Sequence, residues 1–278
     1  MQIRAGYEIA FEFSNDTAVV LMLSIYPDRE KDLLTPHEIK LSPELPTHDY
    51  RDIYGNTCTR FVAPAGPLSI SNSFLMSDSG KPEPAPPPGK LLPVGDLPDD
   101  VLIYLLGSRY CDTQKLFDLA VAQFNGIEDG AKLVQAIVDY VHHRITFGYQ
   151  HARNDRTGFD AHEEQVGVCR DFAHLAVTLC RCMNIPARYC TGYLGDIGVP
   201  VDPAPMDFSA WFEVYLLGEW YTFDARHNQP RIGRIVMARG RDAADVAIST
   251  AFGRPTLTGF VVVTDEVADG TVSAQRVA

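Results

Sequence analysis

The sequence lacks both a long apolar run and an excess of basic residues. No window of its 278 residues approaches the roughly 20 consecutive apolar residues that span a bilayer, and its first residues show no apolar stretch with a small-residue cleavage site. The 24 Lys and Arg against 36 Asp and Glu give a net charge of −12, which disfavours binding to nucleic acid or to an anionic membrane. We therefore expect a cytoplasmic protein that binds neither nucleic acid nor a membrane.

The common metal, redox and nucleotide motifs are also missing. The six cysteines form no C-x-x-C pair, and neither HExxH nor a glycine-rich phosphate-binding pattern occurs. A reducing cytoplasm disfavours structural disulfides. We therefore expect no metal and no cofactor. Five cysteines are interpreted as core or incidental thiols, namely Cys58, Cys111, Cys180, Cys182 and Cys190.

Hydrophobic patterning divides the chain into three parts. Residues 1–76 form short alternating runs between turn signals, which is typical of a β-sandwich. Residues 77–98 are rich in proline without apolar periodicity, which predicts an extended linker. Residues 99–278 predict helices followed by strands, so the fold class is α+β. The expected helices are 99–106, 113–124, 130–144 and 165–183, and the expected strands 187–193, 208–217, 220–225 and 260–264.

One cysteine, Cys169, lies where a nucleophile would be activated. It falls near the start of the predicted helix 165–183, where unpaired N–H groups and the helix dipole stabilise a thiolate. Gly167 just before it permits a close backbone approach, and the thiolate is the reactive form of cysteine. A small buried cysteine that caps the helix would show the same pattern, so both interpretations stay open at this point.

A predicted β-hairpin follows the helix and ends with an acidic residue. Its strands are 208–217 and 220–225, with a turn at 217–219. Asp224 follows apolar and aromatic residues, where a carboxylate is costly to bury without a partner. Arg226 and His227 are the nearest candidate partners in sequence, and a structural salt bridge is the alternative to a functional role.

These segments resemble the bacterial transglutaminase-like superfamily. The resemblance rests on residues 167–175 (GVCRDFAHL), 184–193 (NIPARYCTGY) and 220–224 (WYTFD), while residues 52–56 (DIYGN) are similar to the β-domain that often precedes this core in bacteria. It implies a papain-like, transglutaminase-like α+β core after an N-terminal β-sandwich. It also implies cleavage or transfer at a peptide or protein amide through a thioacyl intermediate on Cys169. In the family's Cys-His-Asp triad, Asp224 would orient the imidazole.

The family histidine has no counterpart here. The family motif is His-Ala-Trp, and this chain has Ser209-Ala210-Trp211. A serine hydroxyl cannot take a proton from a thiol near neutral pH, whereas imidazole can. The triad therefore needs an imidazole from elsewhere if the protein is an enzyme.

The geometry of the hairpin suggests a substitute. If the hairpin turns tightly about Gly218, the numbers of paired residues sum to roughly 436, and Ser209 lies opposite His227 on the same face. We hypothesise that His227 supplies the imidazole. The same register sets Asp224 opposite Phe212, facing away from Ser209, and a bulge or a longer turn would change both placements.

Two functions follow from these residues. The leading one is a cysteine-dependent amide or peptide hydrolase with Cys169, His227 and Asp224, in which Gln165 and the N–H of Cys169 are candidates for an oxyanion hole. Amine transfer is less favoured, since nothing shows how an amine would outcompete water. The alternative is a catalytically inactive member that binds peptide or a partner protein, and Ser209 favours it. The sequence carries no signal for a particular oligomeric state.

Overall fold

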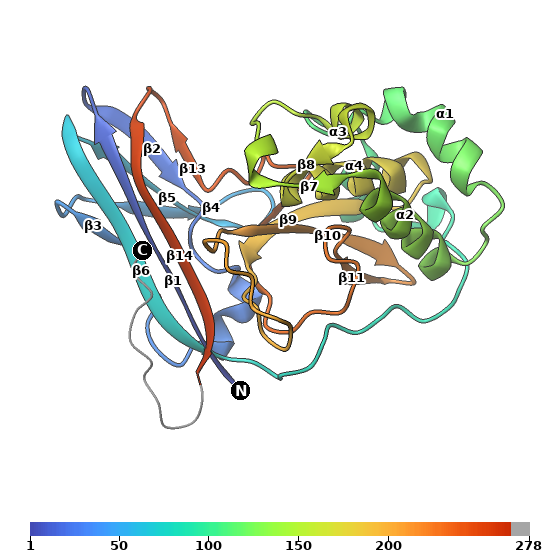
Figure 1. The fold of residues 1–278 in the computed structure, drawn as a ribbon, viewed down its shortest axis with the longest axis horizontal. Coiled ribbons are helices and arrows are strands. Elements are labelled where there is room, and N and C mark those ends of the chain that lie inside the picture. The colour runs from blue at the N-terminus through green and yellow to red at the C-terminus, as the bar shows by residue number, and fades with distance from the viewer. Residues whose placement is uncertain (268–278) are drawn as a thin grey trace.

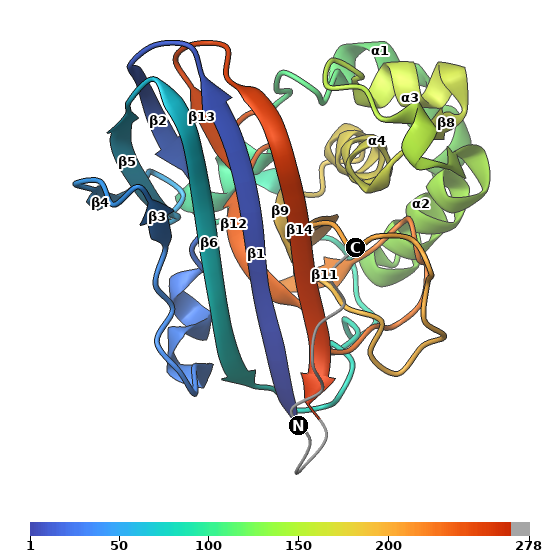
Figure 2. The ribbon, with the colours of Figure 1, turned by 60° about the vertical axis from the view of Figure 1, so that its left-hand side comes forward.

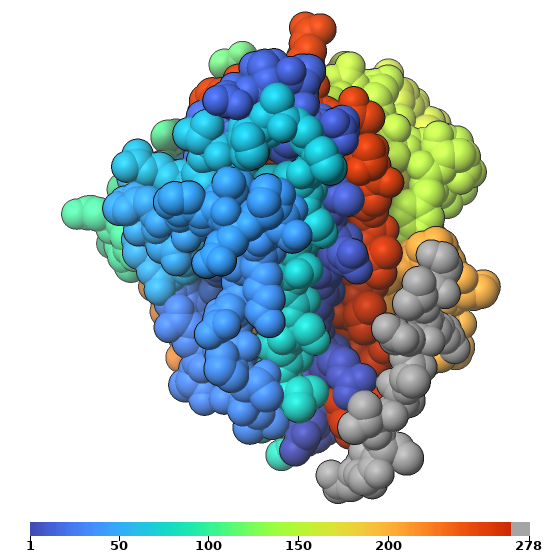
Figure 3. Space-filling model, turned by 90° about the vertical axis from the view of Figure 1, so that its left-hand side faces the viewer, coloured from blue at the N-terminus to red at the C-terminus, as the bar shows by residue number. Residues whose placement is uncertain are grey.

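Both ends of the chain contribute strands to the β-domain, which comprises β1–β6, β13 and β14. In the computed structural model, which describes residues 1–267, β1 pairs with β14 over most of their length. Figure 2 shows β6, β1 and β14 side by side, and Figure 3 shows their outer face. One antiparallel sheet has the order β14 (Thr256–Val267), β1 (Gln2–Phe13), β6 (Gly66–Ser77), β3 (Lys40–Ser42), and the other β13 (Ser249–Ala251), β2 (Thr17–Leu21), β5 (Thr57–Ala63), β4 (His48–Arg51).

The two sheets of the β-domain share one hydrophobic core. Alternate residues of β1, such as Ile3 and Ile9, are buried together with Leu21 of β2, as the period-two pattern predicts. Tyr193 and Ile235, which lie outside the β-domain, belong to the same buried cluster. The β-domain is therefore joined to the rest of the molecule by apolar packing.

The core lobe consists of a central sheet and the helices that cover one side of it (Figure 1). Helix α4 packs on β10 and β9, and its apolar residues share a core with those of β10. The predicted α+β class is confirmed. The sheet has the order β11 (Glu219–Phe223), β10 (Ser209–Leu216), β9 (Ala187–Tyr193), β12 (Ile235–Gly240), and the α-helices are α1 (Thr113–Phe124), α2 (Gly130–Arg144), α3 (Gly158–Glu164), α4 (Cys169–Cys182). Shorter elements are β7 (Thr146–Phe147), β8 (Val166–Gly167), and the 3-10 helices η1 (Pro27–Asp32), η2 (Val94–Asp96), η3 (Asp99–Leu105), η4 (Tyr149–His151).

Most predicted elements agree with the observed ones, and two differ. The predicted helix 165–183 begins four residues too early, because Gln165 is left-handed (φ 58°) and ends α3. Residues Val166–Gly167 then form β8, and α4 begins at Cys169. The segment predicted as the helix 99–106 is the 3-10 helix η3.

The proline-rich segment 77–98 lies along the core lobe. Its course from the end of β6 to the helices can be followed in Figure 1. The carboxylate of Asp129 accepts both the backbone N–H of Lys132, at the start of α2, and that of Gly89 in this segment. Further back, Glu83 forms a salt bridge of 2.8 Å with Arg234. The linker is therefore tied to the core lobe at several points.

Strand pairing bears on the predicted division of the chain. The boundaries 1–76, 77–98 and 99–278 stay a prediction, and residues 268–278 lie outside the described part. The predicted strand 260–264 lies within β14, and both β13 and β14 pair with strands of the first 21 residues. The β-domain thus takes strands from both sides of the core lobe in sequence.

The close approach of β9 and β12 depends on a glycine, which yields a first prediction. Gly192 lies between Ser209 of β10 and Val236 of β12, and a Cβ atom there would overlap the carbonyl oxygen of Ile235. We expect Gly192→Ala to lower the free energy of unfolding in urea by about 1–3 kcal/mol, because the backbone must move. Gly95→Ala is the control, since a Cβ atom at Gly95 meets no atom within 4 Å. Equal stability of the two variants would contradict this account.

Candidate active site

Cys169 is the first residue of α4, and a buried carboxylate holds this end of the helix. The backbone N–H of Val168 donates to Asp171 Oδ2 at 2.8 Å, and Arg156 forms a 3.1 Å salt bridge with the same oxygen. Upstream, β8 pairs with β7 so that Gly167 lies opposite Phe147. The predicted position of Cys169 at a helix N-terminus is confirmed.

The surroundings of the Cys169 thiol favour its protonated form. The pKa of the thiol is raised to about 11, chiefly by burial and with a contribution from the carboxylate of Asp207, whereas the Arg226 guanidinium and the Ala210 backbone N–H act to lower it. The helix terminus was expected to favour the thiolate. Removal of water from the sulfur outweighs that contribution in this structure, because a desolvated charge loses more free energy than a helix end returns.

Asp224 is buried and accepts four hydrogen bonds. Its Oδ1 accepts the backbone N–H groups of Arg226 (3.0 Å) and His227 (3.1 Å), and its Oδ2 pairs with His227 Nδ1 and Arg234 Nη2, each at 2.8 Å. Burial acts to raise the pKa of Asp224, but Arg234 and His227 outweigh it and hold the pKa well below its usual range. His227, one of the two predicted partners, is present. Arg234 takes the position proposed for Arg226.

The predicted hairpin register is wrong by one residue. Leu216 pairs with Glu219, and the last pair is Phe212 with Phe223, so neither His227 with Ser209 nor Asp224 with Phe212 is a pair. The two turn residues, Leu217 and Gly218, both have positive φ, as in a two-residue hairpin turn. Because a shift of one residue exchanges the two faces of a strand, the reason for placing Asp224 away from Ser209 no longer holds.

The turn that carries His227 is docked onto α2 and β7. His142 Nδ1 donates to the carbonyl oxygens of Ala225 and Arg226 at 3.1 and 3.0 Å, and the guanidinium carbon of Arg226 lies 3.7 Å from the ring centre of Phe147. The His227 side chain is partly exposed. Within residues 1–267, no hydrogen bond joins its imidazole to Cys169.

Ser209 begins β10 and is buried. Its carbonyl oxygen accepts a hydrogen bond from Thr191 Oγ1 at 3.2 Å. The next residue, Ala210, is the one whose backbone N–H acts on the Cys169 sulfur. The position of the family histidine is thus adjacent in sequence to a group at the thiol.

The remaining predicted residues occupy different surroundings. Gln165 is exposed, and its carbonyl oxygen accepts the N–H of Thr146 at 2.8 Å, so a role in an oxyanion hole stays a prediction. The five cysteines predicted as core thiols are all buried, whereas Cys169 is partly exposed.

Sequence reasoning missed three groups around the thiol and Asp224, namely Arg234, Asp207 and Tyr149. Arg234 could have been sought, because a buried carboxylate needs a full countercharge and this arginine is ten residues further along the chain. Asp207 and Tyr149 lie in segments without a motif, and only the folding of the chain brings them to Cys169.

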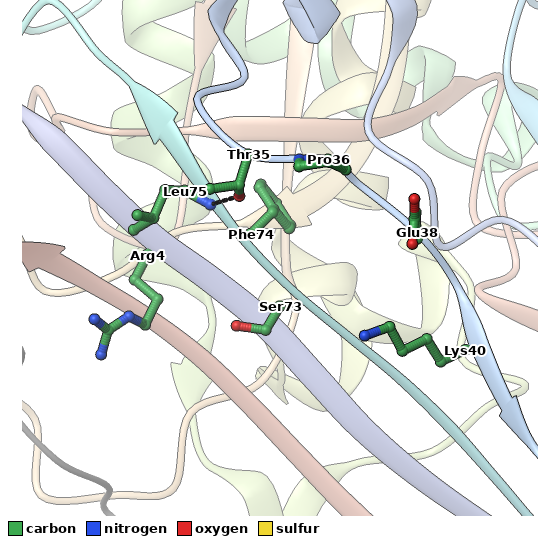
Figure 4. A pocket seen from close by; sticks show the side chains of 8 residues that line it. All are labelled: Arg4, Thr35, Pro36, Glu38, Lys40, Ser73, Phe74 and Leu75. Atoms are coloured by element: carbon green, nitrogen blue, oxygen red, sulfur yellow. Dashed lines mark hydrogen bonds between the residues drawn. The ribbon is translucent and has the colours of Figure 1, made fainter.

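A cavity of about 450 Å³ lies on the β-domain rather than at Cys169. Figure 4 shows its lining side chains, among them Arg4, Ser73 and Lys40, with Thr35 Oγ1 accepting the N–H of Leu75. No predicted site residue lines it. In the described part of the chain, no cluster of three or more His, Cys, Asp or Glu side chains is arranged to hold a metal ion, and no helix has the length and apolarity to cross a membrane.

Comparison with known proteins relates part of this chain to a family. Residues 118–225 match the model of the transglutaminase-like superfamily core. The crystal structure of a Cytophaga hutchinsonii protein proposed to be a cysteine protease superposes with a TM-score of 0.82 at 28% identity, over 99% of this chain and 94% of the other.

Two mycobacterial relatives match shorter segments. An uncharacterised Mycobacterium leprae protein is 34% identical over 97 residues, which are 33% of each chain. A Mycobacterium tuberculosis protein is 34% identical over 114 residues, 36% of this chain and 32% of the other. The chain thus spans about a third of the length of these relatives. The family match includes Cys169, Ser209 and Asp224, so residues 118–225 carry the transglutaminase-like superfamily core.

Proposed function

We propose that the protein is a cysteine-dependent hydrolase of peptide or protein amides. One observation carries this proposal: Cys169 is the first residue of α4 in a family whose chemistry uses such a cysteine, and in the turn after β11 the buried Asp224 pairs with His227. The Cys169 sulfur would attack the amide carbonyl carbon, and the C–N bond would break as the amine leaves with a proton. Water would then hydrolyse the thioester, which releases the acid and the thiol.

Asp224 and His227 have the arrangement that an acid–base pair requires. With Asp224 Oδ2 accepting from Nδ1–H, the imidazole keeps its lone pair on Nε2, from which it can take the thiol proton. Arg234 keeps the carboxylate ionised. Catalytic hydrogen bonds often form only when substrate binds. We therefore propose that His227 contacts Cys169 directly only in the complex with substrate. We also propose a cytoplasmic location, where reducing conditions keep the thiol free.

A second candidate function is binding of a peptide or partner protein without catalysis. Ser209 favours this function, because its hydroxyl cannot act as a base at the position of the family histidine, directly before Ala210. The raised pKa of the Cys169 thiol, about 11, also favours it, since such a thiol is protonated near neutral pH.

The role of His227 can be tested by acylation of the enzyme. We expect wild-type protein to release p-nitrophenolate from p-nitrophenyl acetate in a burst that Cys169→Ala abolishes. His227→Ala and Asp224→Asn should slow the burst by about 10²-fold, since a general base contributes at least that much. An unchanged burst in His227→Ala would remove the base from the proposal and favour the binding function.

Restoring the family histidine gives a gain-of-function test. We expect Ser209→His to increase hydrolysis of fluorescein-labelled casein by about 10²-fold, because an imidazole would then occupy the position of the family histidine, directly before Ala210. Ser209→Asn is the control, with a polar side chain that cannot act as a base. Absence of any gain, together with absence of wild-type activity, would contradict the hydrolase proposal.

The pH dependence of alkylation tests the state of the thiol. Below its pKa, the thiolate fraction of a cysteine rises about tenfold per pH unit. With a pKa of about 11, iodoacetamide should label Cys169 faster at each step from pH 7 to pH 10, without a plateau. Mass spectrometry of the peptide that contains Cys169 gives the rate. A rate that stays constant between pH 6 and pH 9 would show a preformed thiolate and contradict this expectation.

A further inference from the structure

The charged groups around the Cys169 thiol include the guanidinium of Arg226. The carboxylates of Asp207, before β10, and Asp224, after β11, act against the thiolate. Tyr149 of η4 and Tyr189 of β9 also interact electrostatically with the sulfur.

The backbone of Arg226 is fixed on both sides. Its N–H donates to Asp224 Oδ1 at 3.0 Å, and its carbonyl oxygen accepts from His142 Nδ1 at 3.0 Å. The following turn is closed by the hydrogen bond from the Asn228 N–H to the Asp224 carbonyl oxygen at 2.9 Å. The side chain therefore leaves the turn from a defined point.

The Arg226 side chain is directed to the start of α4 by an aromatic ring. Its guanidinium carbon is 3.7 Å from the ring centre of Phe147. Phe147 lies opposite Gly167 in the β7–β8 pair, and the Gly148 N–H donates to the Gly167 carbonyl oxygen at 3.0 Å. Since Gly167 is two residues before Cys169, the cation lies at the end of the helix that carries the thiol.

The charge of Arg226 is not neutralised by a close carboxylate. Within residues 1–267 it forms no salt bridge, although it is partly buried. Other partly buried arginines of the core lobe do form them: Arg188 and Arg239 with Glu213, and Arg234 with Asp224. Asp207 interacts with Arg226 electrostatically without forming a salt bridge, so the guanidinium stacked on the ring still attracts a developing negative charge.

We propose that Arg226 stabilises the thiolate of Cys169, in the role that an imidazolium has in Cys–His pairs; this inference deepens the proposed function and rests on it. Guanidinium cannot accept a proton in a protein, so the S–H proton passes to His227 in the reaction, or to water when the free protein is alkylated. The positive charge lowers the free energy of the sulfur anion that remains. Arg226 is thus a thiolate-stabilising residue and not the base.

The test compares alkylation of Cys169 by neutral iodoacetamide and by anionic iodoacetate in the full chain. We expect Arg226→Gln to slow labelling by iodoacetamide about tenfold at pH 8.5, the change for one pKa unit. The ratio of the iodoacetate rate to the iodoacetamide rate should fall as well, because the cation that attracts the anion is gone. Loosening of the fold would change access for both reagents and leave this ratio unchanged.

Two variants serve as controls. Arg226→Lys keeps the charge and should retain most of the ratio. Arg109→Gln removes an exposed arginine that also lies over an aromatic ring, that of Tyr110, and should change neither rate.

An unchanged reagent ratio in Arg226→Gln would overturn the inference. Labelling needs no turnover, so the two proposals fail separately. If wild-type protein hydrolyses no amide but Arg226→Gln still lowers the ratio, the hydrolase proposal is wrong and the inference holds. If hydrolysis depends on Cys169 and the ratio is unchanged, the inference alone is wrong.

Discussion

The candidate site depends on the buried carboxylate of Asp224. A carboxylate removed from water loses several kcal/mol of hydration unless hydrogen bonds and opposite charge replace it. Two backbone N–H groups, an imidazole and a guanidinium do so here. These bonds shape the turn after β11 and orient His227. They also fix the backbone of Arg226, and so connect the end of β11 with the start of α4.

The same carboxylate connects the site with the proline-rich segment. Arg234 binds Asp224 through Nη2 and Glu83 through Nε, and it lies over the ring of Trp211 at 4.8 Å. Glu83, which lies in the segment that connects the β-domain with the core lobe, therefore contributes to the charge balance of the site. The two parts of the molecule also share a buried apolar cluster. A structural change in either part is therefore expected to alter the surroundings of Asp224.

The structure places two opposed effects on the thiol of Cys169. Cys169 is partly exposed, but its side chain packs against Tyr189, Ala210 and neighbouring residues, which removes much of the water from the sulfur and strengthens any electrostatic contact made there. The same burial disfavours the charged sulfur. An imidazolium at the family position would resolve this conflict, and Ser209 cannot. The balance between Arg226, the Ala210 N–H and the two carboxylates therefore decides how reactive the sulfur is.

The sequence by itself determined most of the elements and the candidate nucleophile. The period-two pattern of β1, the apolar face of α4 and the position of Cys169 at its start are local consequences of residue order, and the family segments around Cys169 and Asp224 are equally local. Loops were less predictable, because Gln165 adopts a left-handed conformation that ends α3 and delays the start of α4.

Only the tertiary structure decided which charges meet. The hairpin register differs by one residue from the predicted one, so Asp224 does not pair with Phe212. The side chain that forms the salt bridge with Asp224 is Arg234 rather than Arg226. Arg226 instead lies over Phe147 and acts electrostatically on the thiol. Such choices depend on turn geometry and on the desolvation of groups far apart in the chain, and these are properties of the folded packing rather than of any local pattern of residues.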